Sequence, residues 1–150
     1  IHGDMKFHNC LPVPGPDGAP EVRVVDWELA DIGEDTWDAG AVIQSYVTAC
    51  VLATQGTMSV TLEPAQPAMR AFWEEYVQAL PIPEAQAEAR LERCVGYAGA
   101  RMLQTALETL VFAPAMTAHV ALVMQISLNI LRDPKAAVRE MMGITPGVYA

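Results

Sequence analysis

From residue 36 to the end of the chain, apolar side chains recur at the three- and four-residue spacing of amphipathic helices. The longest such segment spans residues 84–112, and one face of it carries Ala87, Leu91, Cys94, Ala98, Met102, Leu103, Ala106 and Leu110. Similar patterns predict further helices over residues 36–54, 68–80, 116–131 and 133–143. Pro81, Pro83 and Pro114 lie between these segments, where proline ends helices. The spacing therefore predicts a mainly α-helical protein.

The first 35 residues have a different character. Residues 9–12 and 22–25 have the composition of short strands, and the stretch between them is dense in proline and glycine. Turn-forming residues between two such segments are typical of a β-hairpin. We therefore predict a single domain over residues 1–150, with a small β-hairpin and its loops in residues 1–35 and a helical subdomain in residues 36–150.

The charge balance, the apolar stretches and the cysteines limit the expected partners and location of the chain. The chain has 9 Lys and Arg residues against 18 Asp and Glu residues, a formal net charge of −9. Because no basic stripe is available to neutralise phosphates, nucleic acid is not an expected partner. The longest apolar stretch, residues 116–131, is interrupted by polar side chains, so no membrane span is expected. Cys10, Cys50 and Cys94 are widely separated, which fits a reducing, cytoplasmic environment.

Two short motifs in the first 35 residues place carboxylates and an amide at the spacing used for phosphoryl transfer. His2-Gly3-Asp4 opens the first motif, and Asn9 follows five residues after Asp4. A second carboxylate, Asp26, ends the second predicted strand within the sequence Val-Val-Asp-Trp-Glu. Protein kinases carry the corresponding pattern H-R-D-x-x-x-x-N, followed by D-F-G. In this chain Gly3 stands in place of the arginine, and we expect it to allow close passage of the backbone at this position.

With that glycine, and with Asp26-Trp27-Glu28 in place of D-F-G, the chain resembles the aminoglycoside phosphotransferase and choline kinase family, whose members read close to HGDxxxxN followed by (I/V)DWE. The resemblance covers residues 1–40 by motif, and the rest of the chain only by its helical layout. It implies the C-terminal lobe of a protein-kinase-like fold. Since almost nothing precedes the first motif, we expect the N-terminal lobe to be missing and this lobe to be inactive alone.

The resemblance also implies roles for individual residues. Asp4 would orient the acceptor hydroxyl and receive its proton. Asn9 and Asp26 would bind Mg²⁺ through hard oxygen ligands. His2 and Asp38 would hold the catalytic loop by hydrogen bonds. A simpler role for Asp38 is that of a carboxylate in the first turn of a helix, where it interacts with the helix dipole.

Other polar and aromatic residues allow two interpretations each. Lys6 lies inside the loop, where it could contact the transferred phosphate or be a solvated surface lysine. An acidic run after the second strand could attract an amine-bearing substrate, although such runs are more often solvated loops; it consists of Glu28, Asp31, Glu34 and Asp35. Three aromatic residues could line a substrate cleft, although aromatics at helical spacing are more often core residues: Trp37, Trp73 and Tyr76.

The activity implied by the resemblance is transfer of the γ-phosphate of ATP or GTP, with Mg²⁺, to a hydroxyl group. Relatives act on aminoglycosides, choline, small sugars and peptides. The acceptor pocket of such enzymes draws on the helices that follow the motif, here around residues 45–110. Nothing in those residues identifies the acceptor.

Two other functions stay open. In a metal-dependent, phosphoesterase-like hydrolase, the ligands would be His2, Asp4, His8, Asn9 and Asp26. Such centres usually need further ligands from later loops, and His119, the one remaining histidine, lies in an apolar segment. Alternatively, the chain is a non-catalytic helical module that uses an exposed apolar face to bind a partner or to form a homodimer.

Overall fold

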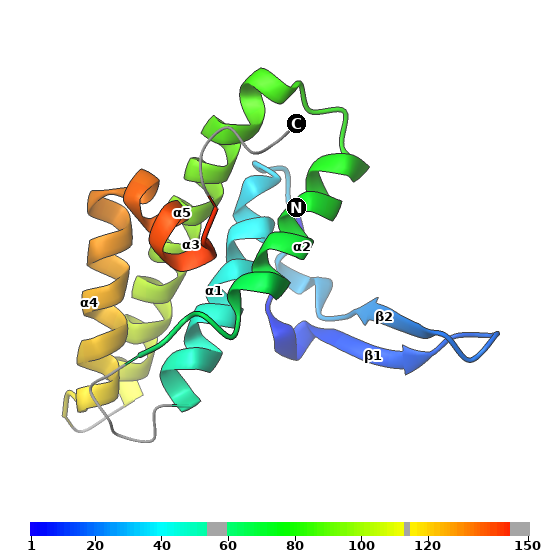
Figure 1. The fold of residues 1–150 in the computed structure, drawn as a ribbon. Helices are drawn as coiled ribbons and strands as arrows, with labels where there is room; N and C mark the ends of the chain where they lie inside the picture. Colours follow the sequence, from blue (N-terminus) through cyan, green and yellow to red (C-terminus); the bar gives the residue numbers. More distant parts are fainter. Residues whose placement is uncertain (54–59, 113–114, 145–150) are drawn as a thin grey trace.

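The structure is a computed structural model of the chain, and it describes residues 1–53, 60–112 and 115–144. Figure 1 shows a two-stranded β-hairpin that projects away from a group of packed helices. The helices are α1 (Thr36–Ala53), α2 (Gln66–Ala79), α3 (Glu84–Phe112), α4 (Ala118–Arg132) and α5 (Pro134–Met142). The described part is thus mainly helical with a small antiparallel sheet, as the sequence predicts. Among these described helices, none has the length and apolar character needed to cross a bilayer.

The hairpin is formed by β1 (Cys10–Pro14) and β2 (Pro20–Val24), which pair antiparallel along their full lengths. Both strands extend further toward the turn than the predicted residues 9–12 and 22–25, so the connecting loop is only residues 15–19. Prolines are tolerated here because both strands are edges of a two-stranded sheet and have one side without a hydrogen-bonding neighbour.

The helix ends follow from local capping residues. The Thr117 hydroxyl accepts a backbone N–H bond in the first turn of α4, and the Asp133 carboxylate does the same for α5. Gly143 ends α5 in a left-handed conformation, with φ +61°. The connector predicted over residues 55–67 lies partly outside the described residues, and α2 begins at Gln66, slightly earlier than predicted.

The core lies where α3 packs against α1 on one side and against α4 on the other. The face of α3 that the periodicity predicts is the one that is buried, and it includes Ala87, Leu91, Cys94, Ala98, Met102 and Ala106. Gly40 lets α1 approach α3 closely, because a Cβ atom there would lie 2.7 Å from the carbonyl oxygen of Cys94. The close packing of α1 on α3 brings residues of both helices to the N-terminal loop, where the motif residues lie.

Candidate functional site

The loop that carries the first motif passes close to the residues that follow the hairpin. Gly3 has a φ of +86°, a left-handed conformation that side chains disfavour. A Cβ atom at this position would lie 2.4 Å from the carbonyl oxygen of Leu29. Both observations require glycine, and they agree with the close backbone passage predicted from the motif.

Replacing Gly3 with alanine should destabilise the protein by more than the roughly 1–2 kcal/mol that a left-handed conformation alone costs. Gly18 provides a matched control, because its φ is +82° but no atom lies within 4 Å of an added Cβ. We expect the midpoint of urea denaturation to fall further for Gly3→Ala than for Gly18→Ala. Equal decreases would contradict the close contact with Leu29.

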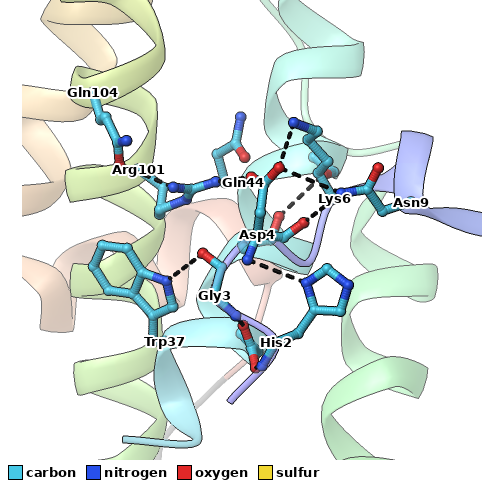
Figure 2. A network of polar contacts seen from close by, with 12 residues as sticks. His2, Gly3, Asp4, Lys6, Asn9, Trp37, Gln44, Arg101 and Gln104 are labelled. Atoms are coloured by element: carbon cyan, nitrogen blue, oxygen red, sulfur yellow. Dashed lines mark hydrogen bonds and ion pairs between the residues drawn. The ribbon is translucent and has the colours of Figure 1, made fainter. Parts of the chain in front are cut away.

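Asp38, in the first turn of α1, binds the backbone of this loop. Its Oδ2 atom accepts a hydrogen bond from the His2 backbone N at 2.6 Å, and its Oδ1 atom accepts one from the Gly3 backbone N at 2.9 Å. The neighbouring Trp37 donates its indole Nε1–H to the Gly3 carbonyl oxygen at 3.0 Å (Figure 2). The start of α1 therefore binds the backbone on both sides of Gly3, which is the contact pattern that the motif implies for Asp38.

His2 connects the loop to the end of β2. The side chain is buried, its Nε2 lies 2.8 Å from the Val25 carbonyl oxygen, and its Nδ1 accepts from the Asp4 backbone N at 3.2 Å. Because Nδ1 is an acceptor, we assign the ring proton to Nε2, where it is donated to Val25. Both ring nitrogens thus have backbone partners, so the contacts favour the loop-holding role of His2 over proton transfer.

The second motif joins the first through Val25. The Val25 backbone N donates to the Asn9 carbonyl oxygen at 3.0 Å, and the Val25 carbonyl oxygen accepts from His2. Both polar groups of this peptide backbone are therefore bonded to the first motif, one residue before Asp26. Asp26 has an exposed side chain and a left-handed backbone with φ +68°, an uncommon conformation that is concentrated at functional sites.

Asn9 is buried beneath the loop and bonds to Asp4. Its Nδ2 atom donates to the Asp4 carbonyl oxygen at 2.9 Å and to the Asp4 Oδ2 atom at 3.3 Å. The five-residue step between the two side chains is closed into one turn by these bonds. Since the amide nitrogen faces Asp4, the amide oxygen is left as the group that can face a cation.

Two cations flank the Asp4 carboxylate (Figure 2). Lys6 Nζ lies 2.5 Å from Oδ2, and Arg101 Nη2 on α3 lies 2.5 Å from Oδ1. Partial burial by itself raises the pKa of Asp4, but the hydrogen bonds and positive charges of Lys6 and Arg101 outweigh it and hold the pKa below its usual range. Asp4 is therefore an anion at neutral pH.

The sequence did not single out Arg101, which is only 7% exposed. Its guanidinium also lies over the ring of Trp37, 5.4 Å from the ring centroid. The helical spacing places Arg101 on the buried face of α3, because it falls seven residues after the buried Cys94 and three after the buried Ala98. A charged residue on the apolar face of a helix needs a partner, and Asp4 is that partner.

A cavity of about 360 Å³ opens beside Asp4, between the loop, α1 and α3. The side chains around it include Asp4 and Lys6 from the loop, Gln44 and Thr48 from α1, and Arg101 and Gln104 from α3. Asn9 and Asp26 are not among its lining residues. Of the residues singled out from the motifs, Asp4, Lys6 and His8 are therefore the ones that line this space.

The acidic run does not line this cavity. Glu34 bonds to Arg93 at 2.6 Å and to Tyr97 at 2.9 Å, and the hydrogen bond from Arg93 is the main reason that its pKa is lowered. Asp35 pairs with Arg90 and accepts a hydrogen bond from the Tyr76 hydroxyl at 2.7 Å. These contacts fasten the start of α1 to α2 and α3. The other two members of the run, Glu28 and Asp31, are exposed.

The aromatic residues have three different environments. Trp73 is fully buried in the core, and Tyr76 is occupied by its bond to Asp35. Trp37 donates to the loop at Gly3, and its ring lies against Arg101 of α3. None of the three is among the residues that line the described cavity, so the interpretation as core residues holds for Trp73, while Trp37 supports the loop.

The lowered pKa values predict sensitivity to acid. The pKa of Asp35, like those of Asp4 and Glu34, lies below its usual range, mainly because the Tyr76 hydrogen bond and Arg90 outweigh partial burial. A carboxylate with a depressed folded-state pKa stabilises the fold above its unfolded-state pKa of about 4, and that contribution is lost as the pH falls through the folded-state pKa. The unfolding free energy, measured by urea titration, should therefore decrease as the pH is lowered below about 4.

The double variant Asp4→Asn/Arg101→Gln removes one of these ion pairs and should make the pH dependence shallower. An unchanged pH profile would contradict the role of the pair.

The side-chain oxygens of Asn9 and Asp26 suit a hard cation such as Mg²⁺. The larger set of motif residues in the hydrolase alternative suits a transition metal less well. An amide oxygen and an exposed carboxylate are ligands that Mg²⁺ accepts. In residues 1–53, 60–112 and 115–144, no group of three or more His, Cys, Asp or Glu side chains is placed to hold a metal ion. The five-ligand hydrolase centre also requires His2, whose two ring nitrogens are already bonded to backbone atoms.

Comparisons of the chain with protein-family models, with curated proteins and with solved structures found no match.

Proposed function

We propose that this chain carries the catalytic half-site of an ATP-dependent phosphotransferase of the aminoglycoside phosphotransferase and choline kinase type, with the fold of a kinase-like C-terminal lobe. One observation carries the proposal: the backbone of Val25 bonds both to Asn9 and to His2, next to Asp26. The same loop presents Asp4 to a cavity. Two motifs that are separate in sequence thus form one hydrogen-bonded unit, as phosphoryl transfer between a nucleotide and a hydroxyl requires.

Asp4 has the surroundings of a residue that orients an acceptor. Lys6 and Arg101 each contact a different carboxylate oxygen, and an ionised carboxylate has further lone pairs that can accept a hydroxyl hydrogen bond. With its lowered pKa, Asp4 is a weak base, so it would position the hydroxyl first and receive the proton as the phosphoryl group is transferred. Lys6, whose side chain is 41% exposed, would contact the phosphate from the same side.

Asn9 and Asp26 would hold Mg²⁺ through their side-chain oxygens. When bound, the ion would neutralise charge on the nucleotide phosphates. Asn9 is fixed by its two bonds to Asp4, and Asp26 by the bonds of the preceding residue, Val25. Both motifs would therefore contribute an oxygen ligand to the ion.

Magnesium binding and phosphoryl transfer can be tested separately. In this chain, Mn²⁺ added as a paramagnetic substitute for Mg²⁺ should broaden the NMR signals of Asn9 and Asp26, and ATP should strengthen the effect. In the natural protein that contains this sequence, called the full-length protein below, ADP formation should depend on an added hydroxyl acceptor from a panel of amines, sugars and peptides. Tight binding of Zn²⁺ without nucleotide, together with hydrolysis of p-nitrophenyl phosphate, would instead favour the hydrolase.

A further inference from the structure

The cavity beside Asp4 has amide and hydroxyl groups on two walls. On α1, Gln44 is only 7% exposed, and its Nε2 donates to Thr48 Oγ1 at 2.9 Å. This bond fixes the amide and leaves its Oε1 to accept a hydrogen bond from a ligand. The Thr48 hydroxyl, which accepts from Gln44, still has a proton to donate. The α1 wall therefore offers one acceptor and one donor close together.

A continuous polar chain runs along the facing wall, on α3. Arg101 Nη1 donates to Gln104 Oε1 at 2.9 Å, and Gln104 Nε2 donates to Glu108 Oε1 at 2.8 Å. Because Arg101 also pairs with Asp4, these bonds link the carboxylate at one end of the cavity to Glu108. Side chains held in this way present their remaining hydrogen-bonding groups in fixed directions.

The charges around the cavity cancel. Its fully charged lining side chains are Asp4, Lys6, Arg101 and Glu108, two carboxylates against two cations, and His8 adds an exposed imidazole. Both oxygens of Asp4 are already paired with cations. Among the described lining residues, Glu108 is the carboxylate not paired with a cation, and its Oε1 already accepts a bond from Gln104. A polycationic ligand would therefore lose solvation here with a partner for only one of its charges, and that loss disfavours binding.

The size and the apolar part of the cavity limit the ligand further. A volume of about 360 Å³ lies at the lower end of the roughly 300–1,000 Å³ found for small-molecule sites. Phe7, Leu29 and Leu52 add apolar surface, which suits the C–H faces of a sugar ring. The lining thus combines hydroxyl-matching groups with apolar patches.

From these observations we infer that the acceptor is an uncharged, polyhydroxylated small molecule about the size of a sugar, bound with one hydroxyl directed at Asp4. The inference rests on the proposed phosphotransferase function, and it names the substrate class of that site. It differs from the interpretation of the acidic run as an attractor of amines, since Glu34 and Asp35 are paired with arginines away from the cavity.

Binding can be measured in this chain without nucleotide. The side-chain amide signals of Gln44 and Gln104 in a ¹⁵N-correlated NMR spectrum report directly on the two walls. Titrations would compare glucose with its amine analogue glucosamine and with the polyamine spermidine. We expect glucose to shift both signals and to bind at least as tightly as glucosamine, and spermidine to leave both signals unmoved. Tighter binding of spermidine or glucosamine, or no shift with glucose up to its solubility limit, would overturn the inference.

Matched variants test the walls. Gln44→Leu removes the fixed acceptor at similar volume and should weaken glucose binding by about five- to tenfold. Thr48→Val is a second, milder change on the same wall and should weaken binding in the same direction. Glu108→Gln removes a charge but keeps the polar chain, so glucose binding should change by less than about twofold. A large loss with Glu108→Gln, or none with either α1 variant, would contradict the inferred ligand class.

The two proposals can fail separately. Glucose binding at Gln44 and Gln104 without any ATP-dependent phosphorylation in the full-length protein would count against the phosphotransferase function. Phosphorylation of a polycationic acceptor would support that function and overturn the inference of an uncharged substrate.

Discussion

In the proposed phosphotransferase, replacing Asp4 with asparagine is expected to lower the rate of phosphoryl transfer by about 10²- to 10⁴-fold, the range that loss of a positioned proton acceptor produces. Asparagine keeps the shape of the side chain, but it has no negative charge and turns an NH₂ donor toward either Lys6 or Arg101. The rate is measured as acceptor-dependent ADP formation in the full-length protein. Asp17→Asn, an exposed carboxylate in the hairpin turn, changes the net charge equally and should keep the wild-type rate.

The same substitution leaves a buried cation without its partner, so the loss of activity needs a structural control. Arg101 is 7% exposed, and breaking a buried ion pair by removing one member costs about 3–5 kcal/mol. The double variant Asp4→Asn/Arg101→Gln removes both charges and should regain most of this stability but none of the activity. If activity returned with stability, Asp4 would be a structural residue and the catalytic assignment would be wrong.

Replacing Asp38 with alanine is expected to release the loop that carries His2 and Gly3 and to lower the free energy of unfolding by about 3 kcal/mol or more. The carboxylate accepts two backbone hydrogen bonds, from His2 at 2.6 Å and from Gly3 at 2.9 Å, and each bond to a charged group contributes about 1.5–3 kcal/mol. A carboxylate that acted only on the dipole of α1 would contribute about 0.3–1 kcal/mol. The size of the decrease therefore separates the two roles proposed for Asp38.

Urea denaturation gives the size of this decrease, and hydrogen exchange shows where it acts. The backbone amides of His2 and Gly3 should exchange faster in Asp38→Ala, while amides in the middle of α3 keep their relative protection. Asp133→Ala is the matched control, because Asp133 caps α5 through one backbone hydrogen bond and is exposed; its removal should cost about 1 kcal/mol. A decrease for Asp38→Ala no larger than for Asp133→Ala would show that Asp38 does not hold the loop.

Local features of the chain were predicted well because they depend on residues that are neighbours in sequence. The buried face of α3 follows from the three- and four-residue spacing of its apolar residues. The glycine requirement at Gly3 follows from the motif. The strand ends were less accurate, because the prolines at Pro14 and Pro20 can join a ladder only where a strand lacks a second neighbour. Sequence spacing does not report how many strands a sheet has.

The composition and the periodicity of this chain determine a mainly helical protein with a small hairpin, and the motifs determine which residues form the loop around Asp4. Lys6, one cation beside Asp4, is a neighbour in sequence, whereas the second cation comes from packing. Arg101 lies 97 positions from Asp4, and the two meet only because α1 packs on α3 beside the loop. The same packing pairs Glu34 with Arg93, away from the cavity beside Asp4. Spacing along a chain encodes which face of a helix is apolar, whereas the pairing of charges depends on which faces of different helices meet.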